Sequence, residues 1–238
     1  MSAPGLPVLV MRDVSRGYGA LRPLRIATLD VEEAERVAVG GLDAGVAELL
    51  VNLITGASLP DTGEIRLFGR GTSEIADGEE WLASLERFGI VSPRAVLLEA
   101  STLLQNLAMP FTLEIDPVTA EVTERVRDLA VRCGIDAARW LTVAAGELPA
   151  DVRVRAHLAR ALALDPRFLI VEHPTADVPP AARNALAADL ARATAEAEVT
   201  LLLLTNDEGF GSAVAPRHLR LDGATGLLKE IRRGWFTW

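Results

Sequence analysis

The chain has 238 residues, with 24 Lys or Arg against 33 Asp or Glu, so its formal net charge is −9 at pH 7 and its pI is about 4.9. This acidic balance argues against a nucleic-acid partner, because phosphate binding requires a concentrated basic face. Apolar residues make up 50% of the chain, enough for a sizeable core in one or two domains. No apolar run approaches the roughly 18 residues that span a bilayer, and a lone cysteine, Cys133, excludes an internal disulfide. We expect a soluble, cytoplasmic protein.

Short apolar runs of β-strand length occupy the first part of the chain, at 8–14, 25–29, 36–39 and 64–68. Between the last two, apolar residues at the spacing of one helix face predict a helix that begins near Ala44. A second helix is expected around residues 81–85, just before a strand at 88–91.

Helical periodicity dominates the middle of the chain, from 101 to 164. Val122, Val126, Leu129 and Cys133 recur every three or four residues, and Asp116-Pro117 is a typical start signal. Apolar runs of strand length return at 168–171 and 199–204, with an Ala-rich helix at 181–197 between them. Continuous runs of this kind are typical of buried parallel strands. The order predicts an α/β core interrupted by a helical insertion.

Several motifs follow one another from the first third of the chain to its end. They are SRGYG, VAVGG followed by NLITG, LPDTGEIRLFGR, TLLQNLAMPF, AHLARALALDPRFLIVEHPTA and TLLLLTND. In this order and spacing the chain resembles the ATP-binding subunits of ABC transporters. The resemblance implies a P-loop NTPase-like α/β fold with a mixed sheet core, an antiparallel β edge and a helical subdomain. We expect one domain over 1–238, with a core lobe of 1–91 and 165–238 and a helical subdomain of 92–164.

The phosphate-binding loop of that family requires glycines, a lysine that reaches the phosphates, and a hydroxyl on Mg²⁺. In this chain the loop spans Gly41 to Leu49 and keeps Gly41 and Gly45. The resemblance places the family's lysine at Ala47 and its Ser-Thr pair at Glu48 and Leu49. A carboxylate at Glu48 repels a triphosphate, so these positions predict a degenerate ATP site.

The other nucleotide motifs also depart from the family pattern. Pro93 stands at the glutamine that senses Mg²⁺, and Asp151 stands at a glycine of the signature loop. Glu172 and His173 take the places of the metal-binding Asp and the catalytic Glu, and Asn206 takes that of the switch histidine. His173 has the chemistry of a general base. The losses nevertheless favour a residual role for it, so we name no catalytic residue and no metal ligand.

Tyr18 is the one nucleotide contact that matches the family, at the place where an aromatic ring stacks on adenine. Stacking contributes about 1 to 3 kcal/mol and does not replace a phosphate clamp. A tyrosine beside a glycine is equally typical of packing near a strand end.

These observations lead to one main prediction and two alternatives. The main prediction is a catalytically degenerate, structural or regulatory subunit of a membrane transporter that does not bind or hydrolyse ATP normally, with no cofactor expected. The first alternative is an active ATPase with altered motifs that uses ATP and Mg²⁺, in which Glu172, His173 and Tyr18 act with arginines from nearby segments. The second alternative is a soluble pseudo-enzyme that is unconnected with transport.

The resemblance also implies partners and a location. They are an integral membrane permease and either a competent ATPase subunit or a second copy of the chain, at the inner face of the cell membrane. Two segments are candidate partner surfaces: 92–98, and the aromatic tail 232–238.

Overall fold

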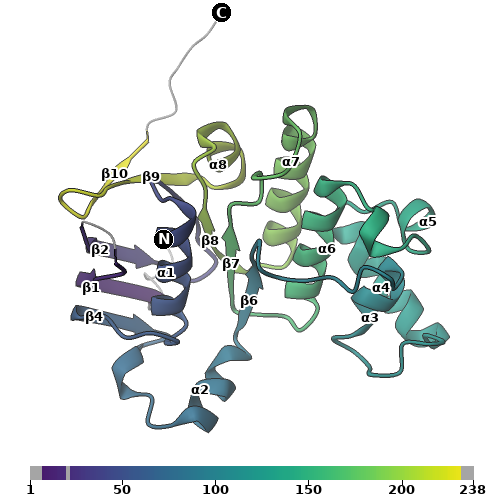
Figure 1. The fold of residues 1–238 in the computed structure, drawn as a ribbon, viewed down its shortest axis with the longest axis horizontal. Helices are drawn as coiled ribbons and strands as arrows, with labels where there is room; N and C mark the ends of the chain where they lie inside the picture. The colour runs from purple at the N-terminus through teal and green to yellow at the C-terminus, as the bar shows by residue number, and fades with distance from the viewer. Residues whose placement is uncertain (1–6, 20–21, 232–238) are drawn as a thin grey trace, which may run out of the picture.

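The computed structural model describes residues 7–19 and 22–231, and the tail 232–238 lies outside them. The first three elements of the described chain are strands, and helices α3 to α6 follow one another between β6 and β7. Figure 1 shows the strands gathered on one side and helices α3 to α7 on the other. The strands are β1 (Leu9–Arg16), β2 (Leu24–Val31), β3 (Arg36–Gly40), β4 (Thr62–Leu67), β5 (Arg70–Gly71), β6 (Phe88–Val91), β7 (Phe168–Glu172), β8 (Thr200–Leu204), β9 (Arg217–Asp222) and β10 (Leu227–Glu230). The helices are α1 (Ala44–Ile54), α2 (Gly78–Leu85), α3 (Leu103–Ala108), α4 (Ala120–Arg132), α5 (Ala137–Trp140), α6 (Ala150–Leu162), α7 (Pro180–Glu196) and α8 (Glu208–Val214), with short 3₁₀ turns at Thr72–Glu74 and Ala145–Glu147.

Two sheets make up the β part of the fold. The larger has the order β10-β9-β3-β8-β7-β6, in which all neighbours are parallel except β10 and β9. The smaller has the order β2-β1-β4-β5 and is antiparallel throughout. The predicted fold class, a mixed sheet with an antiparallel edge and a set of helices, is confirmed.

Successive side chains of the central strands point to opposite faces of the larger sheet, so the apolar core has one part on each face. Phe168 and Ile170 of β7 pack with α1 and the antiparallel sheet, whereas Leu169 and Val171 pack with the helices inserted between β6 and β7. Both faces of β7 and β8 are therefore covered, which is why their sequences are continuous apolar runs.

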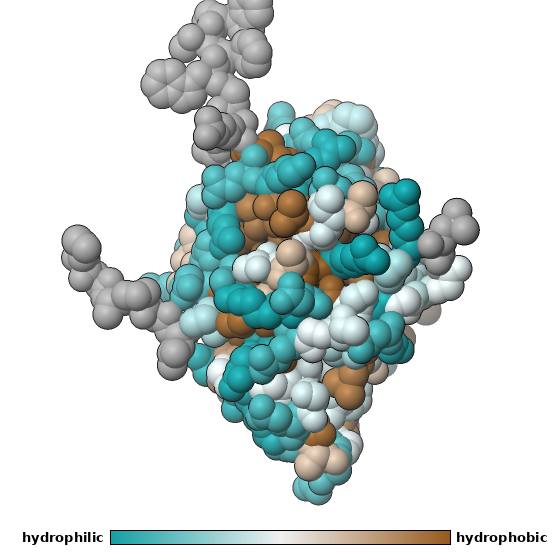
Figure 2. Space-filling model, turned by 90° about the vertical axis from the view of Figure 1, so that its left-hand side faces the viewer, coloured by the Kyte–Doolittle hydropathy of each residue, from teal (hydrophilic) through white to brown (hydrophobic). Residues whose placement is uncertain are grey.

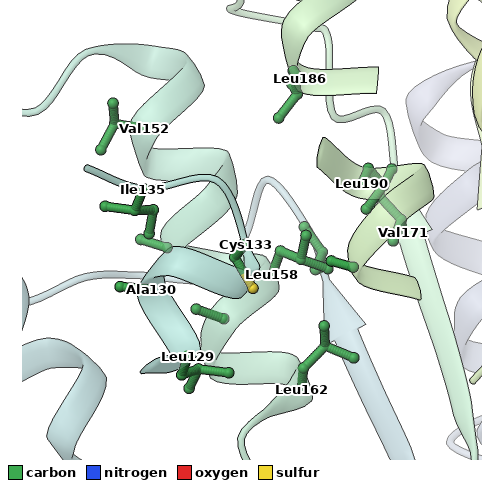
Figure 3. Close-up of a cluster of buried hydrophobic side chains, with 14 of the residues drawn as sticks. Leu129, Ala130, Cys133, Ile135, Val152, Leu158, Leu162, Val171, Leu186 and Leu190 are labelled. Carbon is green, nitrogen blue, oxygen red and sulfur yellow. The ribbon is translucent and has the colours of Figure 1, made fainter. Parts of the chain in front are cut away.

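The helical part of the core is built around α4 and α6. Cys133 follows the last residue of α4 and lies beside Leu158 of α6, with Leu129 and Leu162 nearby (Figure 3). Burial raises the pKa of the Cys133 thiol to about 12, so this cysteine acts as a small apolar side chain. The helix itself begins at Ala120 and not at the predicted Asp116-Pro117, and Thr119 caps it because its hydroxyl accepts from the Val122 amide.

The outer face of the antiparallel sheet is largely polar. Figure 2 shows the side of the molecule that lies on the left in Figure 1, where hydrophilic side chains surround several apolar patches. Within the described residues no helix is both long enough and apolar enough to cross a membrane.

The two-sided burial of β8 leads to a stability prediction. Replacing Leu203, which is fully buried, by Ala removes apolar contacts and leaves a cavity, so we expect the free energy of unfolding to fall by about 2 to 5 kcal/mol. Leu113, which is 96% exposed, is the matched control, and its replacement by Ala should change stability by less than about 0.5 kcal/mol. Urea unfolding followed by circular dichroism measures both, and similar losses in the two variants would contradict this account of the core.

Candidate functional site

Parallel pairing brings the carboxyl ends of three strands to one edge of the larger sheet. Val39 of β3 and Glu172 of β7 both lie opposite Leu204 of β8, one on each side. The residues that follow each strand therefore meet at this edge, where open α/β sheets bind their ligands. Three of the predicted site segments, those around Gly41, Glu172 and Asn206, are brought together in this way.

The loop between β3 and α1 requires glycine at its first position. Gly41 has a φ of 82°, and a Cβ at this residue would lie 2.6 Å from the carbonyl oxygen of Leu221. Asn206 holds the loop from the end of β8: its Oδ1 accepts from the amides of Gly41 and Leu42 at 2.8 and 3.2 Å, and its Nδ2 donates to the Leu42 carbonyl at 2.6 Å. Asn206, at the switch-histidine position, is a structural tie between β8 and the loop.

Asp43 caps the helix that follows the loop. Its Oδ1 accepts from the amide of Val46 at 2.8 Å, which satisfies one of the free amides at the start of α1. Ala47, the predicted lysine position, is fully buried in the core beneath the antiparallel sheet, and Leu49 packs against the same core. These two residues therefore support α1 and do not reach a ligand.

A single arginine joins the two carboxylates of the site. The guanidinium of Arg94 donates to both oxygens of Glu172 at 3.0 and 2.8 Å, and it lies 3.3 Å from a carboxylate oxygen of Glu48. The Glu172 side chain is 1% exposed and that of Arg94 is 44% exposed. Glu48 is therefore not an isolated negative charge at the loop, because a cation from the segment after β6 lies against it.

His173 directly follows Glu172 in an unusual backbone conformation. Its φ is 41°, which is rare for a residue with a side chain, and its amide donates to the Leu204 carbonyl at 2.8 Å. Its Nε2 is buried and has no hydrogen-bond partner among the described residues. Glu172 and His173 line a cavity of about 430 Å³ together with Arg153 and His157 of α6.

Asp151, also on α6, does not present a free charge. Its carboxylate accepts from Arg155 at 2.7 Å, and Arg155 also binds Asp189 of α7. The negative charge predicted for the signature loop is thus compensated within the helix.

Tyr18 lies at a second cavity, of about 340 Å³, next to the loop between β3 and α1. Gly41, Asp43 and Val46 line this cavity, together with Arg22 and Arg25 from the start of β2. Tyr18 is 38% exposed, so its ring is accessible to a ligand. An aromatic ring, two arginines and the beginning of a helix thus surround one opening.

Sequence reasoning missed several residues of this edge: the cap Asp43, the bridging Arg94, and the pair Arg22 and Arg25. One signal was available, since the chain contains a single lysine, Lys229, and every other long cationic side chain is an arginine. No cluster of three or more potential metal ligands occurs within 7–19 and 22–231.

The fold and the strand-end site define the class of protein, and the comparisons agree with it. A family model described as ABC transporter matches residues 24–176, from the start of β2 past the end of β7. This match covers more than half of the chain, and the chain belongs to the ABC transporter ATP-binding family.

Curated relatives with ATP-binding functions match over most of the chain. The methionine import ATP-binding protein MetN of Brucella abortus is 29% identical over 98% of this chain and 62% of its own length. The lipoprotein-releasing system ATP-binding protein LolD of Chromohalobacter salexigens is 31% identical over 82% of this chain and 80% of its own. The macrolide export ATP-binding/permease protein MacB 1/2 of Paracoccus denitrificans is 30% identical, and the match spans 34% of its length. The chain thus spans less than two thirds of the MetN and MacB proteins.

Solved structures share the fold. The ATP-binding cassette MJ0796, in a dimeric post-hydrolysis state bound to ADP and Pi, superposes with a TM-score of 0.74 over 95% of this chain and 100% of that one, at 20% identity. The cbiO1 structure from Clostridium perfringens, part of the transporter complex cbiONQ, gives 0.75 over 96% of this chain and 88% of that one, at 20% identity.

The comparisons contradict the main functional prediction, a catalytically degenerate subunit with no cofactor. The family match spans residues 24–176, which include Gly41 to Leu49 and Glu172, and the curated relatives are named ATP-binding proteins. The prediction was wrong because it equated the loss of single side chains with the loss of the site. A substituted position can be compensated by a side chain from another segment, as Arg94 compensates the charge of Glu48 here.

The Arg94 bridge leads to a test of charge compensation. Arg94→Ala leaves the buried Glu172 carboxylate without its partner, so we expect the free energy of unfolding to fall by about 3 kcal/mol at pH 7. Glu48→Ala removes only an exposed carboxylate and should cost less than about 1 kcal/mol. Urea unfolding of both variants measures the difference, and a larger loss for Glu48→Ala would contradict the assignment of Glu172 as the main partner.

His157 of α6 makes the stability of the folded chain depend on pH. Burial, then the charges of Arg160 and Arg153, lower the pKa of His157 to about 4. The unfolded chain binds this proton below about pH 6.5 and the folded chain does not, so stability falls as the pH drops from 6.5 towards 4. His157→Gln should reduce the difference in unfolding free energy between pH 7.5 and pH 5. An imidazole that titrates near 6.5 by NMR in the folded protein would overturn this prediction.

Proposed function

We propose that the chain is the ATP-binding and ATP-hydrolysing subunit of an ABC transporter, working with an integral membrane permease at the cytoplasmic face of the membrane. The observation that carries the proposal is the 340 Å³ cavity in which Tyr18 and the loop at Gly41 lie side by side at the start of α1. An aromatic ring beside a phosphate-binding loop fits the two ends of a nucleotide. Membership of the family supports the same conclusion.

The nucleotide base stacks on Tyr18, and the phosphates extend along the loop towards Glu172. The amide of Val46 is held by the Asp43 carboxylate in the structure described here, so a phosphate oxygen that binds this amide exchanges with Asp43. Such an exchange replaces one anion by another at the start of α1, so the partial positive charge of the helix N-terminus still has a negative charge beside it.

The donor set at the strand edge fits Mg²⁺. Magnesium is usually bound through one or two carboxylates, substrate phosphates and water, and Glu48 and Glu172 converge on one small volume, since both reach the Arg94 guanidinium. These two residues would hold the ion, which supplies charge neutralisation to the phosphates when bound. Arg94, with its side chain half exposed, leaves the carboxylates and is then free to bind a phosphate oxygen.

His173 is the residue that we assign to proton transfer. Its buried Nε2 is unpaired within the described residues and lies one position beyond Glu172, at the place of the family's catalytic carboxylate. An imidazole there can accept the proton of a water that attacks the terminal phosphate. Its strained backbone, with a φ of 41°, is consistent with a residue whose position serves chemistry.

The segment 92–98 is the surface that we assign to the permease. Val96 and Leu98 are 72% and 50% exposed, and Asn106, fully buried in α3, holds the segment through two hydrogen bonds with the backbone of Leu98. An apolar surface on a fixed backbone suits a protein partner. The same segment carries Arg94, so a permease bound there would contact the stretch of backbone that holds this arginine at the nucleotide site. The division of the chain into a core lobe and a helical subdomain stays a prediction.

The proposal is tested by calorimetric titration of the purified chain with Mg-ATP. We expect a dissociation constant between about 1 μM and 1 mM, the range in which enzymes bind their substrates. Absence of binding at 1 mM Mg-ATP, with the chain shown to be folded, would refute the proposed function.

Hydrolysis is tested on the chain purified with its permease from native membranes. His173→Ala should lower phosphate release by at least about 100-fold, the scale of general-base catalysis, and should leave Mg-ATP binding within twofold of the parent chain. Unchanged phosphate release would remove His173 from the mechanism, and lost binding would show that its role is structural.

A further inference from the structure

We propose that Arg22 and Arg25, at the start of β2, bind the phosphates of the nucleotide and supply the positive charge that the phosphate-binding loop lacks. This inference rests on the proposed function and deepens it, because it assigns the phosphate contacts to residues outside the loop. It concerns the cavity beside Tyr18 and not the Arg94 bridge.

The need for such residues follows from the composition of the chain. Its single lysine, Lys229, is in β10 and lies 3.3 Å from the carboxylate of Asp222. Ala47, where the family has its lysine, is buried. Any long cationic side chain that meets the phosphates must therefore be an arginine. Arginine suits this role, because its planar fork binds two phosphate oxygens at once.

Arg22 and Arg25 are the arginines that line the same cavity as the loop. The cavity of about 340 Å³ is bounded by both of them, by Tyr18, and by Gly41 and Asp43. Sites for small molecules have volumes of about 300 Å³ and more, so this cavity is large enough to be one. A ligand that stacks on Tyr18 and extends towards Gly41 thus lies beside both guanidinium groups.

Both side chains are free to bind an anion. Arg22 and Arg25 are exposed, and neither forms an ion pair or side-chain hydrogen bond with any residue of 7–19 or 22–231. Other arginines of the same sheet are already paired: Arg12 binds Asp30 and Arg16 binds Asp61. In a chain with a net charge of −9, two arginines that have no ion pair among the described residues form a local excess of positive charge at one cavity.

Asp43 is the only carboxylate among the residues that line this cavity, so the lining carries two positive charges and one negative charge. Phosphates are attracted by the arginines and repelled by Asp43, and the balance between them sets the affinity. The arginines and Asp43 should therefore have opposite effects on binding when their charges are removed.

The test is a calorimetric comparison of ligands with increasing numbers of phosphates. Adenosine, AMP, ADP, ATP and inorganic tripolyphosphate are titrated into the full chain and into Arg22→Ala, Arg25→Ala and the double variant. We expect the dissociation constant for ATP to rise about tenfold in each single variant and about 100-fold in the double variant. Each arginine lost removes a hydrogen bond to a charged group, and such a bond changes a dissociation constant by about tenfold. The loss should grow from AMP to ATP, while adenosine binding should not change.

Three variants serve as controls. Asp43→Asn keeps a good helix cap and should strengthen ATP binding, because it removes the opposing charge. Arg127→Ala, on the exposed surface of α4 where Arg127 pairs only with Glu124, makes the same change in net charge and should have no effect. The double variant with lysine at 22 and 25 keeps both charges and should recover part of the affinity, which excludes misfolding as the cause of a loss.

Each outcome either supports or overturns the assignment. ATP binding that is unchanged in the double alanine variant would refute the role of Arg22 and Arg25 and leave the proposed function in place. Tripolyphosphate binding that depends on the two arginines, without any ATP binding, would support the anion site and refute the proposed function. A chain that binds neither ligand would overturn both.

Discussion

The parallel pairing of β3, β8 and β7 is the interaction on which the candidate site depends. These short strands are buried on both faces, so the apolar core fixes their positions, and their shared direction brings all their carboxyl ends to one edge. Polar residues that are far apart in the sequence, such as Gly41, Glu172 and Asn206, meet there without any direct preference for each other. Because the core cannot rearrange at low cost, the polar edge has a fixed backbone on which side chains can vary.

Much of the fold could be predicted from the sequence, because its strongest signals concern the core. The apolar runs at 36–39, 168–171 and 199–204 correspond to β3, β7 and β8, and the continuity of the last two indicated burial on both faces. The boundaries of helices were harder to predict, because a boundary depends on which nearby side chain caps the first turn. Asp116-Pro117 has the residue types of a helix start, yet α4 begins at Ala120 and is capped by Thr119, whose hydroxyl reaches the third residue after it.

The site was harder to predict, since a motif shows which side chain is replaced but not which side chain compensates. Glu48 at the hydroxyl position suggested repulsion of phosphate, and only the structure places Arg94 against it, from a segment nearly fifty residues away in the chain. Asp151 is a similar case, because Arg155 one turn later neutralises it. Substituted motifs therefore led to a prediction of lost function that the family comparisons contradict.

Asn206 also connects the site to nearby helices of the fold. Three hydrogen bonds of a single amide group connect the segment after β8 to the segment after β3, so these two segments cannot separate without breaking all three. Helix α8 begins only two residues later, with Asp207 as its cap, and Arg183 of α7 binds the same aspartate. Asn206 and Asp207 therefore connect the loop around Gly41 to α8 and α7 through side-chain contacts of two successive residues.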